Sequence, residues 1–145
     1  MKKYLILIFL FITGVALAND VDQKRPEVGN IVKAWEGAQG EQVWTLRYGK
    51  PEDHKALVQI VNIDHPWNKK IFLTSVEEKN NNRSDYVVMQ NNKRFVALIT
   101  NNYSGELYLP NQSSTIQVYF NKALSSEGNA QYFLTDYLNQ QNGDQ

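Results

Sequence analysis

The chain has 145 residues, no cysteine and a formal net charge of zero. Without cysteine it can form no disulfide, use no cysteine nucleophile and carry no lipid anchor of the bacterial lipoprotein type, because that anchor is attached to a cysteine thiol. The balanced charge gives no electrostatic attraction to phosphate backbones or anionic lipid, so we expect neither nucleic acid nor a membrane surface as a partner.

The first 18 residues have the pattern of a secretory signal peptide. Lys2 and Lys3 form a positively charged start, an apolar run follows from Tyr4 to Leu17, and Ala16 and Ala18 are the small residues that a signal peptidase reads. The apolar run is short for a bilayer of ~30 Å. We therefore expect cleavage after Ala18 and, because the short charged start is typical of bacteria, a mature protein in the periplasm or outside the cell.

The mature chain, residues 19–145, has the size of one domain. Loss of Lys2 and Lys3 leaves 13 basic against 15 acidic side chains, a formal charge of −2. Residues 19–26 and 140–145 are polar and show no periodicity, so we expect both ends to fray. Because no disulfide can form, the hydrophobic core alone must stabilise this domain.

Residues 27–36 fit two patterns. Val28, Ile31, Val32 and Trp35 would share one face of a helix, whereas Ile31, Lys33 and Trp35 would share one face of a strand. Gly29 and the β-rich region that follows favour the strand, but the pattern leaves both open.

From residue 42 to residue 120, short runs of alternating apolar residues predict antiparallel strands. QVWTLRY places Trp44, Leu46 and Tyr48 on one face, whereas KALVQIVNI has apolar residues on both faces, so we expect both faces of that strand to be covered. The next runs are KKIFLTSVEE, DYVVMQ, RFVALIT, GELYLP and STIQVYF, separated by the asparagine- and serine-rich turns KNNNRS, NNK, NNYSG and NQSS. Seven or eight such strands predict a mainly β, single-domain antiparallel sandwich or partly closed barrel.

The last segment changes to a helical period. Its apolar residues recur at the spacing of one helical face and predict a C-terminal amphipathic helix: Ala130, Phe133, Leu134, Tyr137 and Leu138. Ser125, Ser126 or Asn129 could cap its start.

The residues that usually carry catalysis are sparse. His54 and His65 are the only histidines, and neither GxSxG nor HExxH is present. The acidic pairs Glu52-Asp53 and Glu77-Glu78 are neighbours that would point to opposite faces of a strand. We therefore expect no enzymatic activity, no metal and no cofactor, and keep an unrecognised hydrolase as a distant alternative.

One short motif points to recognition. Ser104-Gly105-Glu106-Leu107-Tyr108 has the form SGxxY, which resembles the loop motif of bacterial periplasmic lysozyme inhibitors. The resemblance covers five positions, three of them specified, and the cysteines of the membrane-bound inhibitors are absent. It implies that Ser104 and Tyr108 lie on a loop that enters the cleft of a target enzyme. The same residues also fit a plain hairpin, in which Gly105 supplies a positive φ and Pro110 ends the strand.

A small, nearly neutral domain rich in tyrosine and asparagine suits binding better than turnover. We expect an inhibitor or immunity-type protein that blocks another protein, such as a cell-wall-degrading enzyme or a toxin. The predicted partner-binding residues are Asn102, Tyr103, Ser104 and Tyr108; the alternative surface is Asp64, His65 and Trp67. A glycan- or small-ligand-binding module, with Trp35, Trp44 and Trp67 as a stacking platform, is the second expectation. The sequence does not predict the oligomeric state.

Overall fold

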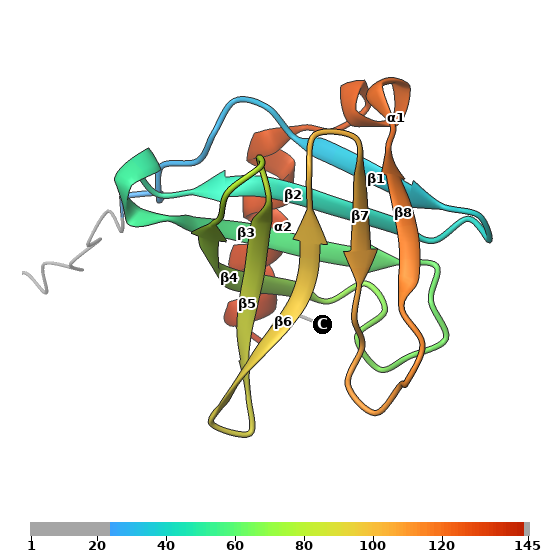
Figure 1. The fold of residues 1–145 in the computed structure, drawn as a ribbon. Coiled ribbons are helices and arrows are strands. Elements are labelled where there is room, and N and C mark those ends of the chain that lie inside the picture. The colour runs from blue at the N-terminus through green and yellow to red at the C-terminus, as the bar shows by residue number, and fades with distance from the viewer. Residues whose placement is uncertain (1–23, 144–145) are drawn as a thin grey trace, which may run out of the picture.

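The computed structural model describes residues 24–143, so the predicted signal peptide lies outside the described residues. Eight strands pair in chain order and close into one antiparallel barrel, because β8 returns to pair with β1 (Figure 1). The strands are β1 Lys33–Gly37, β2 Gln42–Tyr48, β3 Lys55–Val61, β4 Ile71–Glu78, β5 Ser84–Gln90, β6 Lys93–Thr100, β7 Ser104–Leu107 and β8 Ile116–Phe120, with a short 3-10 helix η1 at Pro51–Asp53. The mainly β prediction is confirmed, and the choice between sandwich and barrel is decided by the β1–β8 pairing.

The asparagine-rich connections form tight turns, as their composition predicts. Three of the four predicted turns, KNNNRS, NNK and NQSS, have asparagines with a left-handed backbone, with positive φ at Asn81, Asn82, Asn91, Asn92 and Asn111. Asn62, in the connection between β3 and β4, also has a positive φ. Asparagine tolerates this conformation because its short polar side chain can hydrogen-bond locally. These turns let each strand return beside the one before it.

Apolar side chains fill the interior of the barrel. Trp35, Val43, Val58, Leu98 and Val118 are all buried there, from five different strands. Trp67, in the connection between β3 and β4, closes one end of this core and packs against Phe72 and Phe95, with ring centroids 4.5 and 5.8 Å away. The core therefore occupies the middle and one end of the barrel.

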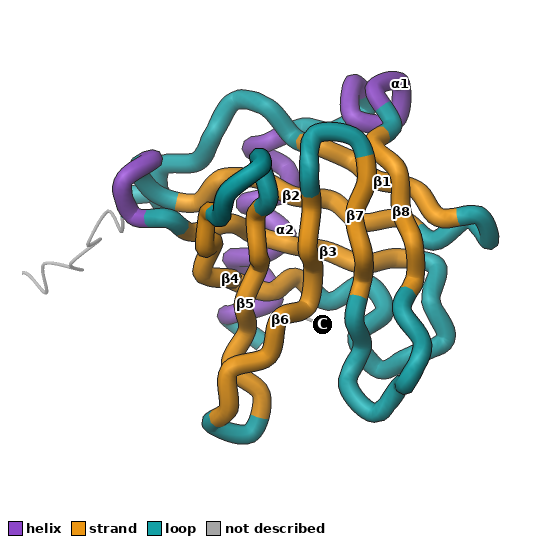
Figure 2. The backbone as a smooth tube through the Cα atoms, in the orientation of Figure 1, coloured by secondary structure: helices purple, strands orange, loops and turns teal. Residues whose placement is uncertain are grey.

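The C-terminal helix α2, Ala130–Gln141, lies across the outside of β2, β3 and β4 (Figures 1 and 2). Phe133, Leu134 and Tyr137 are buried against Leu46 and Leu57, which confirms the predicted helix face. Burial of such side chains stabilises by roughly 1.5–3 kcal/mol each. The outward row of β2 and the second apolar face of β3 are thus both covered, as expected.

Hydrogen bonds fix the N-terminal half of α2. Asn129, one of the three predicted caps, accepts a hydrogen bond from the Tyr132 amide at 3.0 Å and begins α2. Arg25 donates to the Gln131 carbonyl at 2.8 Å and to Thr135 Oγ1 at 2.7 Å. Arg25 belongs to residues 19–26, which were expected to fray, yet its side chain is hydrogen-bonded to α2.

A second short helix, α1 at Lys122–Ser126, was not predicted. Asn121 caps it by accepting from the Leu124 amide at 2.9 Å, and Ser125 accepts from the Ala34 amide at 2.8 Å. Ser125 thus ties α1 to β1 instead of capping α2. No helix within residues 24–143 is long and apolar enough to cross a membrane.

The ambiguous segment 27–36 is extended rather than helical. Lys33 to Gly37 form β1, and Val28 bridges to Tyr48 at the end of β2. Val28 and Val32 are buried beneath α2, whereas Ile31 is 73% exposed. The strand alternative is therefore the correct one from Lys33 onward.

Candidate functional site

The outer surface of the barrel is covered on one side only. The two helices lie over β1 to β4, and no helix of the described residues covers the outer face of β5 to β8 (Figures 1 and 2). Strand register aligns one outward residue from each uncovered strand in a continuous row: Asp85, Ile99, Glu106 and Gln117. This row lines a groove with a volume of about 950 Å³.

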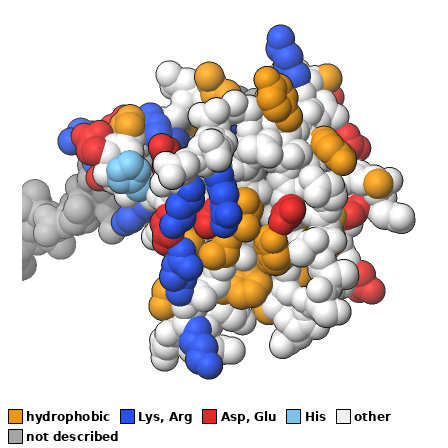
Figure 3. Space-filling view, viewed as in Figure 1, with side chains coloured by type: hydrophobic (Ala, Val, Ile, Leu, Met, Phe, Trp, Pro, Cys, Tyr) orange, Lys and Arg blue, Asp and Glu red, His pale blue; other side chains and the backbone are white. Residues whose placement is uncertain are grey.

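Basic and acidic side chains gather on this face. Figure 3 shows several Lys and Arg side chains along β5 and β6 with acidic groups between them. Lys79, Arg83 and Arg94 line the groove together with Asp85 and Glu106. The surface therefore offers charges of both signs at close range.

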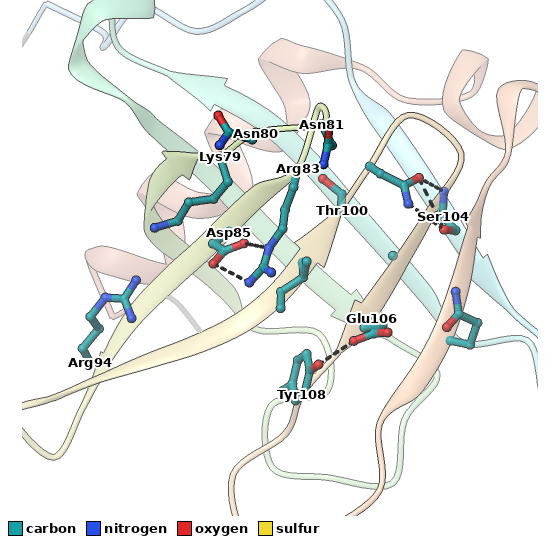
Figure 4. Close-up of a pocket in the computed structure, with 14 residues that line it drawn as sticks. Lys79, Asn80, Asn81, Arg83, Asp85, Arg94, Thr100, Ser104, Glu106 and Tyr108 are labelled. Carbon is teal, nitrogen blue, oxygen red and sulfur yellow. Dashed lines mark hydrogen bonds and ion pairs between the residues drawn. The ribbon is translucent and has the colours of Figure 1, made fainter.

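These charges are paired with one another. Arg83 donates to both oxygens of Asp85, at 2.7 and 3.0 Å, and the two side chains point toward each other in Figure 4. Asp85 is only 4% exposed, so Arg83 satisfies a buried carboxylate. The hydrogen bonds that Arg83 donates to Asp85 raise the pKa of Arg83 further above its ordinary value. This pair fixes the position of the half-exposed guanidinium in the lining of the groove.

A second pair crosses from β6 to β4. Arg94 donates through Nε to Glu77 at 3.1 Å and through a second nitrogen to the other oxygen, while Lys79 lies 3.2 Å from Glu77. Hydrogen bonding to Arg94 and then to Lys79 lowers the pKa of Glu77. All three groups are partly exposed, so the arrangement organises the surface more than it stabilises the fold.

Tyr108 and Glu106 form a third contact in the groove. The Tyr108 hydroxyl donates to Glu106 Oε2, as the dashed line in Figure 4 shows. This hydrogen bond is the largest cause that raises the pKa of Tyr108, and burial adds to it. Tyr108 therefore presents a neutral phenol whose position is set by its neighbour on the same strand face.

The turn between β6 and β7 is organised by Asn101. Its Oδ1 accepts hydrogen bonds from the amides of Tyr103 and Ser104, each at 2.9 Å, and its Nδ2 donates to Ser104 Oγ at 3.2 Å. The turn is thus closed by a side chain as well as by backbone, which is the usual role of asparagine in such turns. Tyr103 at its tip is 79% exposed.

Gly105 is required for a different reason from the one predicted. Its φ is not positive; instead, it lies inside β7 where a Cβ atom would come within 3.0 Å of the Ile99 carbonyl and 3.2 Å of Val118. Close approach of neighbouring strands, rather than turn geometry, therefore demands glycine here. The prediction of a positive φ at Gly105 was wrong.

The predicted partner-binding residues divide between the groove and its rim. Ser104 and Tyr108 both line the groove, whereas Asn102 and Tyr103 are exposed at the adjoining turn. Leu107 and Leu109 are buried, at 0% and 4% exposed. The alternation expected from the sequence thus holds, and the outward residues of the SGxxY motif lie on one surface.

The alternative surface has a structural role in large part. Trp67 is 6% exposed and belongs to the core. His65 Nδ1 accepts from the Trp67 amide at 3.1 Å, so its other nitrogen carries the proton and donates to the Pro110 carbonyl at 3.1 Å. Asp64 is exposed, but little of the Trp67 ring is available to a partner.

Sequence reasoning missed Lys79, Arg83, Asp85 and Arg94. Lys79 and Arg83 lie in the connection between β4 and β5, whereas Asp85 lies in β5 and Arg94 in β6. Only the register of the barrel strands brings them beside Ser104 and Tyr108. The one local signal was Arg83 two residues before Asp85, a spacing that places both side chains on the same face of a strand. Among the described residues, no three side chains of the metal-ligating types cluster as a metal site would need.

Comparisons with protein-family models, with curated proteins and with solved structures found no match to this chain.

Proposed function

We propose that the protein is an exported binding protein of the inhibitor or immunity type, which blocks a cell-wall-degrading enzyme. The uncovered outer face of β5 to β8 and the β6–β7 turn form its contact surface. One observation carries the proposal: Ser104 and Tyr108, the outward residues of the motif that resembles lysozyme inhibitors, line the same groove, and Tyr103 stands exposed at its rim.

The chemistry of the groove favours a protein partner. Its guanidinium and carboxylate groups are already paired, so they retain fixed positions and still have lone pairs and N–H groups at the surface. Such preorganised polar groups beside exposed tyrosine suit a broad, hydrated protein interface. A small free anion would have to compete with Asp85 and Glu77 for the arginines.

The expected glycan-binding alternative receives less support. Stacking on sugar rings needs exposed aromatic faces, and two exposed tryptophans in one plane were the expected sign. Trp35 and Trp67 are 3% and 6% exposed, and Trp44 is half-buried. The tryptophans therefore serve packing instead of forming a platform.

One observation favours a hydrolase as the second candidate. Asp85 and Glu106 are two carboxylates in one groove, which is the equipment of a glycosidase. However, Arg83 donates to both oxygens of Asp85, and Asp85 is only 4% exposed, so this carboxylate is not available to a substrate. Release of sugar from purified peptidoglycan by the protein alone, lost in Asp85→Asn, would establish the hydrolase and remove the inhibitor proposal.

A binding experiment tests the proposal. Immobilised mature protein is exposed to a panel of lysozymes of different classes and, separately, to soluble peptidoglycan fragments. We expect saturable binding of at least one lysozyme and none of the fragments. Replacement of Tyr103 and Ser104 by alanine should weaken binding by ~2 kcal/mol or more if they are a hot spot, which is a factor of about 30 in affinity.

The control variant is Tyr132→Ala, because Tyr132 is 73% exposed on α2, on the helix-covered side of the barrel. It removes the same exposed ring from outside the proposed surface and should leave affinity unchanged. Binding of the fragments instead of a lysozyme would establish the glycan alternative.

A further inference from the structure

Tyr119 is an exposed aromatic side chain next to the candidate groove. It lies in β8, where it pairs with Ser104 of β7 on one side and with Glu36 of β1 on the other (Figure 1). Because side chains alternate along a strand, these three residues form one outward row, whereas Phe120 points the opposite way. Phe120 packs edge-on against Trp35, with ring centroids 5.4 Å apart. Tyr119 is 59% exposed, so a large ring is open to a partner directly beside the motif serine.

Glu36 supplies a negative charge next to this ring. Directly opposite residues on paired antiparallel strands, such as Glu36 and Tyr119, have Cβ atoms about 5 Å apart. Asn121 Nδ2 donates to Glu36 Oε2 at 2.8 Å and holds the half-buried carboxylate in place. In the described part of the chain, Oε1 accepts no hydrogen bond and Glu36 takes part in no ion pair. One carboxylate oxygen therefore remains available to a donor from another molecule.

Glu36 and Tyr119 both line a pocket of about 430 Å³. The other lining residues come from the β1–β2 turn, the end of β8 and the start of α1: Gly37, Ala38, Phe120, Asn121 and Lys122. Lys122 is exposed and forms no ion pair with Glu36. The pocket thus offers an aromatic face and a carboxylate oxygen side by side. A guanidinium can use both, because it donates to a carboxylate in its own plane and lies flat against an aromatic ring.

We propose that this pocket binds an arginine side chain of the partner enzyme, with the guanidinium between the Glu36 carboxylate and the Tyr119 ring. The inference rests on the proposed function, because it names a group that the enzyme presents. The outward row places this arginine beside Ser104, so both contacts belong to one interface. Arginine suits the pocket better than lysine, whose ammonium has no planar face to lie against the ring. Tyr119 and Glu36 therefore help to determine which enzymes the protein binds.

Titration of the ¹⁵N-labelled protein with Nα-acetyl-arginine amide, followed by NMR, tests the pocket without an enzyme. We expect saturable shifts concentrated at the amides of Glu36, Tyr119 and Asn121. Nα-acetyl-citrulline amide has nearly the same shape without the charge and should bind several-fold more weakly. Glu36→Gln and Tyr119→Ala should each raise the dissociation constant for the arginine compound about two- to fivefold, the scale of an exposed ion pair and of an exposed cation–π contact.

Glu52→Gln and Tyr132→Ala are the matched controls. Glu52 lies in η1 and Tyr132 in α2, and both are exposed and outside the residues that line the pocket. Each control should leave binding of the arginine compound unchanged, and unchanged melting temperatures will show that every variant folds. The proposal is overturned if the arginine compound gives no saturable shifts, if the citrulline compound binds equally well, or if Glu52→Gln weakens binding as much as Glu36→Gln.

The same variants separate this inference from the proposed function. With a lysozyme that wild type binds, Glu36→Gln should weaken binding about two- to fivefold, and Glu52→Gln should not. Equal binding of that lysozyme by wild type and Glu36→Gln would overturn the arginine site and leave the inhibitor proposal standing. Specific binding of the arginine compound by a protein that binds no lysozyme would support the pocket and overturn the inhibitor proposal.

Discussion

At the scale of single residues, two positions in and beside the β6–β7 turn shape the candidate surface. Asn101 holds the β6–β7 turn through three hydrogen bonds, and Gly105 lets β7 approach its neighbours. Asn101 hydrogen-bonds to Ser104, and Gly105 follows Ser104 in the chain. Both residues therefore fix the position of the motif serine. The sequence pattern SGxxY therefore has a structural part, the glycine, and an outward part, the serine and tyrosine.

Gly105→Ala should destabilise the barrel. The new methyl group would meet the Ile99 carbonyl at 3.0 Å, Val118 at 3.2 Å and Thr100 at 3.3 Å, all in a packed region. We expect a loss of about 1–3 kcal/mol in the free energy of unfolding, as overpacking usually costs. Asn102→Ala, at the exposed tip of the same turn, should stay within about 0.5 kcal/mol. Equal stability of both variants in urea would contradict this role of the glycine.

Tyr86 should make the fold sensitive to alkaline pH. Burial is the main cause that raises its pKa, partly offset by hydrogen bonds with Thr100 and Thr45. As the pH rises past the ordinary tyrosine value near 10, the unfolded chain loses this proton first, so the free energy of unfolding falls until the folded pKa is passed. Below pH 10, Tyr86 is protonated in both states, so its ionisation does not lower the free energy of unfolding.

The measurement is the free energy of unfolding of wild type and Tyr86→Phe at a series of alkaline pH values. Phenylalanine cannot ionise, so the variant should lose less stability than wild type over that range. Parallel curves would show that Tyr86 ionises as readily in the folded barrel as in the unfolded chain.

At the scale of elements, sequence periodicity was enough for most strands and for α2. Apolar residues recur with a period of two in β2 to β8 and with a period of 3.6 in α2, and in each case the face that they form is buried in the structure. The short helix α1 escaped prediction because its five residues, KALSS, cannot show an amphipathic period. Its place depends on tertiary bonds from Ser125 to β1, which lie 91 residues away in the chain.

Leu134→Ala should show that α2 is part of the folded domain. Leu134 is fully buried between the helix and the barrel, so its truncation should open a cavity and cost about 2–5 kcal/mol. Tyr132→Ala changes an exposed ring on the same helix and should cost little. A denaturation midpoint for Leu134→Ala equal to that of wild type would mean that the helix contributes nothing to the stability of the barrel.

At the scale of the whole molecule, closure of the barrel decides where the candidate site lies. The sequence predicts the strands but not which residues of distant strands lie side by side, because that depends on the register of three strand pairings, β5–β6, β6–β7 and β7–β8. Asp85 and Gln117 are 32 positions apart in the chain, yet the row through Ile99 and Glu106 joins them in one groove. Ser104 and Tyr108 could thus be chosen from the motif, whereas Arg83, Asp85 and Arg94 could not.

Packing of α2 on one side of the barrel leaves the outer face of β5 to β8 without a covering helix in the described residues. The helix covers the apolar outward residues of β2 and β3, whereas the outward residues of β5 to β8 that line the groove include Asp85, Glu106 and Gln117. A partner that binds there would need no rearrangement of the fold, so association should resemble that of preorganised inhibitors.

Inhibition of cell-wall lysis is the most direct test of this account. The rate at which a bound lysozyme clears a suspension of cell walls is measured against increasing concentrations of wild type, Tyr103→Ala/Ser104→Ala and Tyr132→Ala. We predict that wild type and Tyr132→Ala slow lysis equally and that the double variant needs about 30-fold more protein, the factor that ~2 kcal/mol represents. Lysis that is unaffected by wild type, or slowed as strongly by the double variant, would contradict the assignment of this surface to an inhibitor.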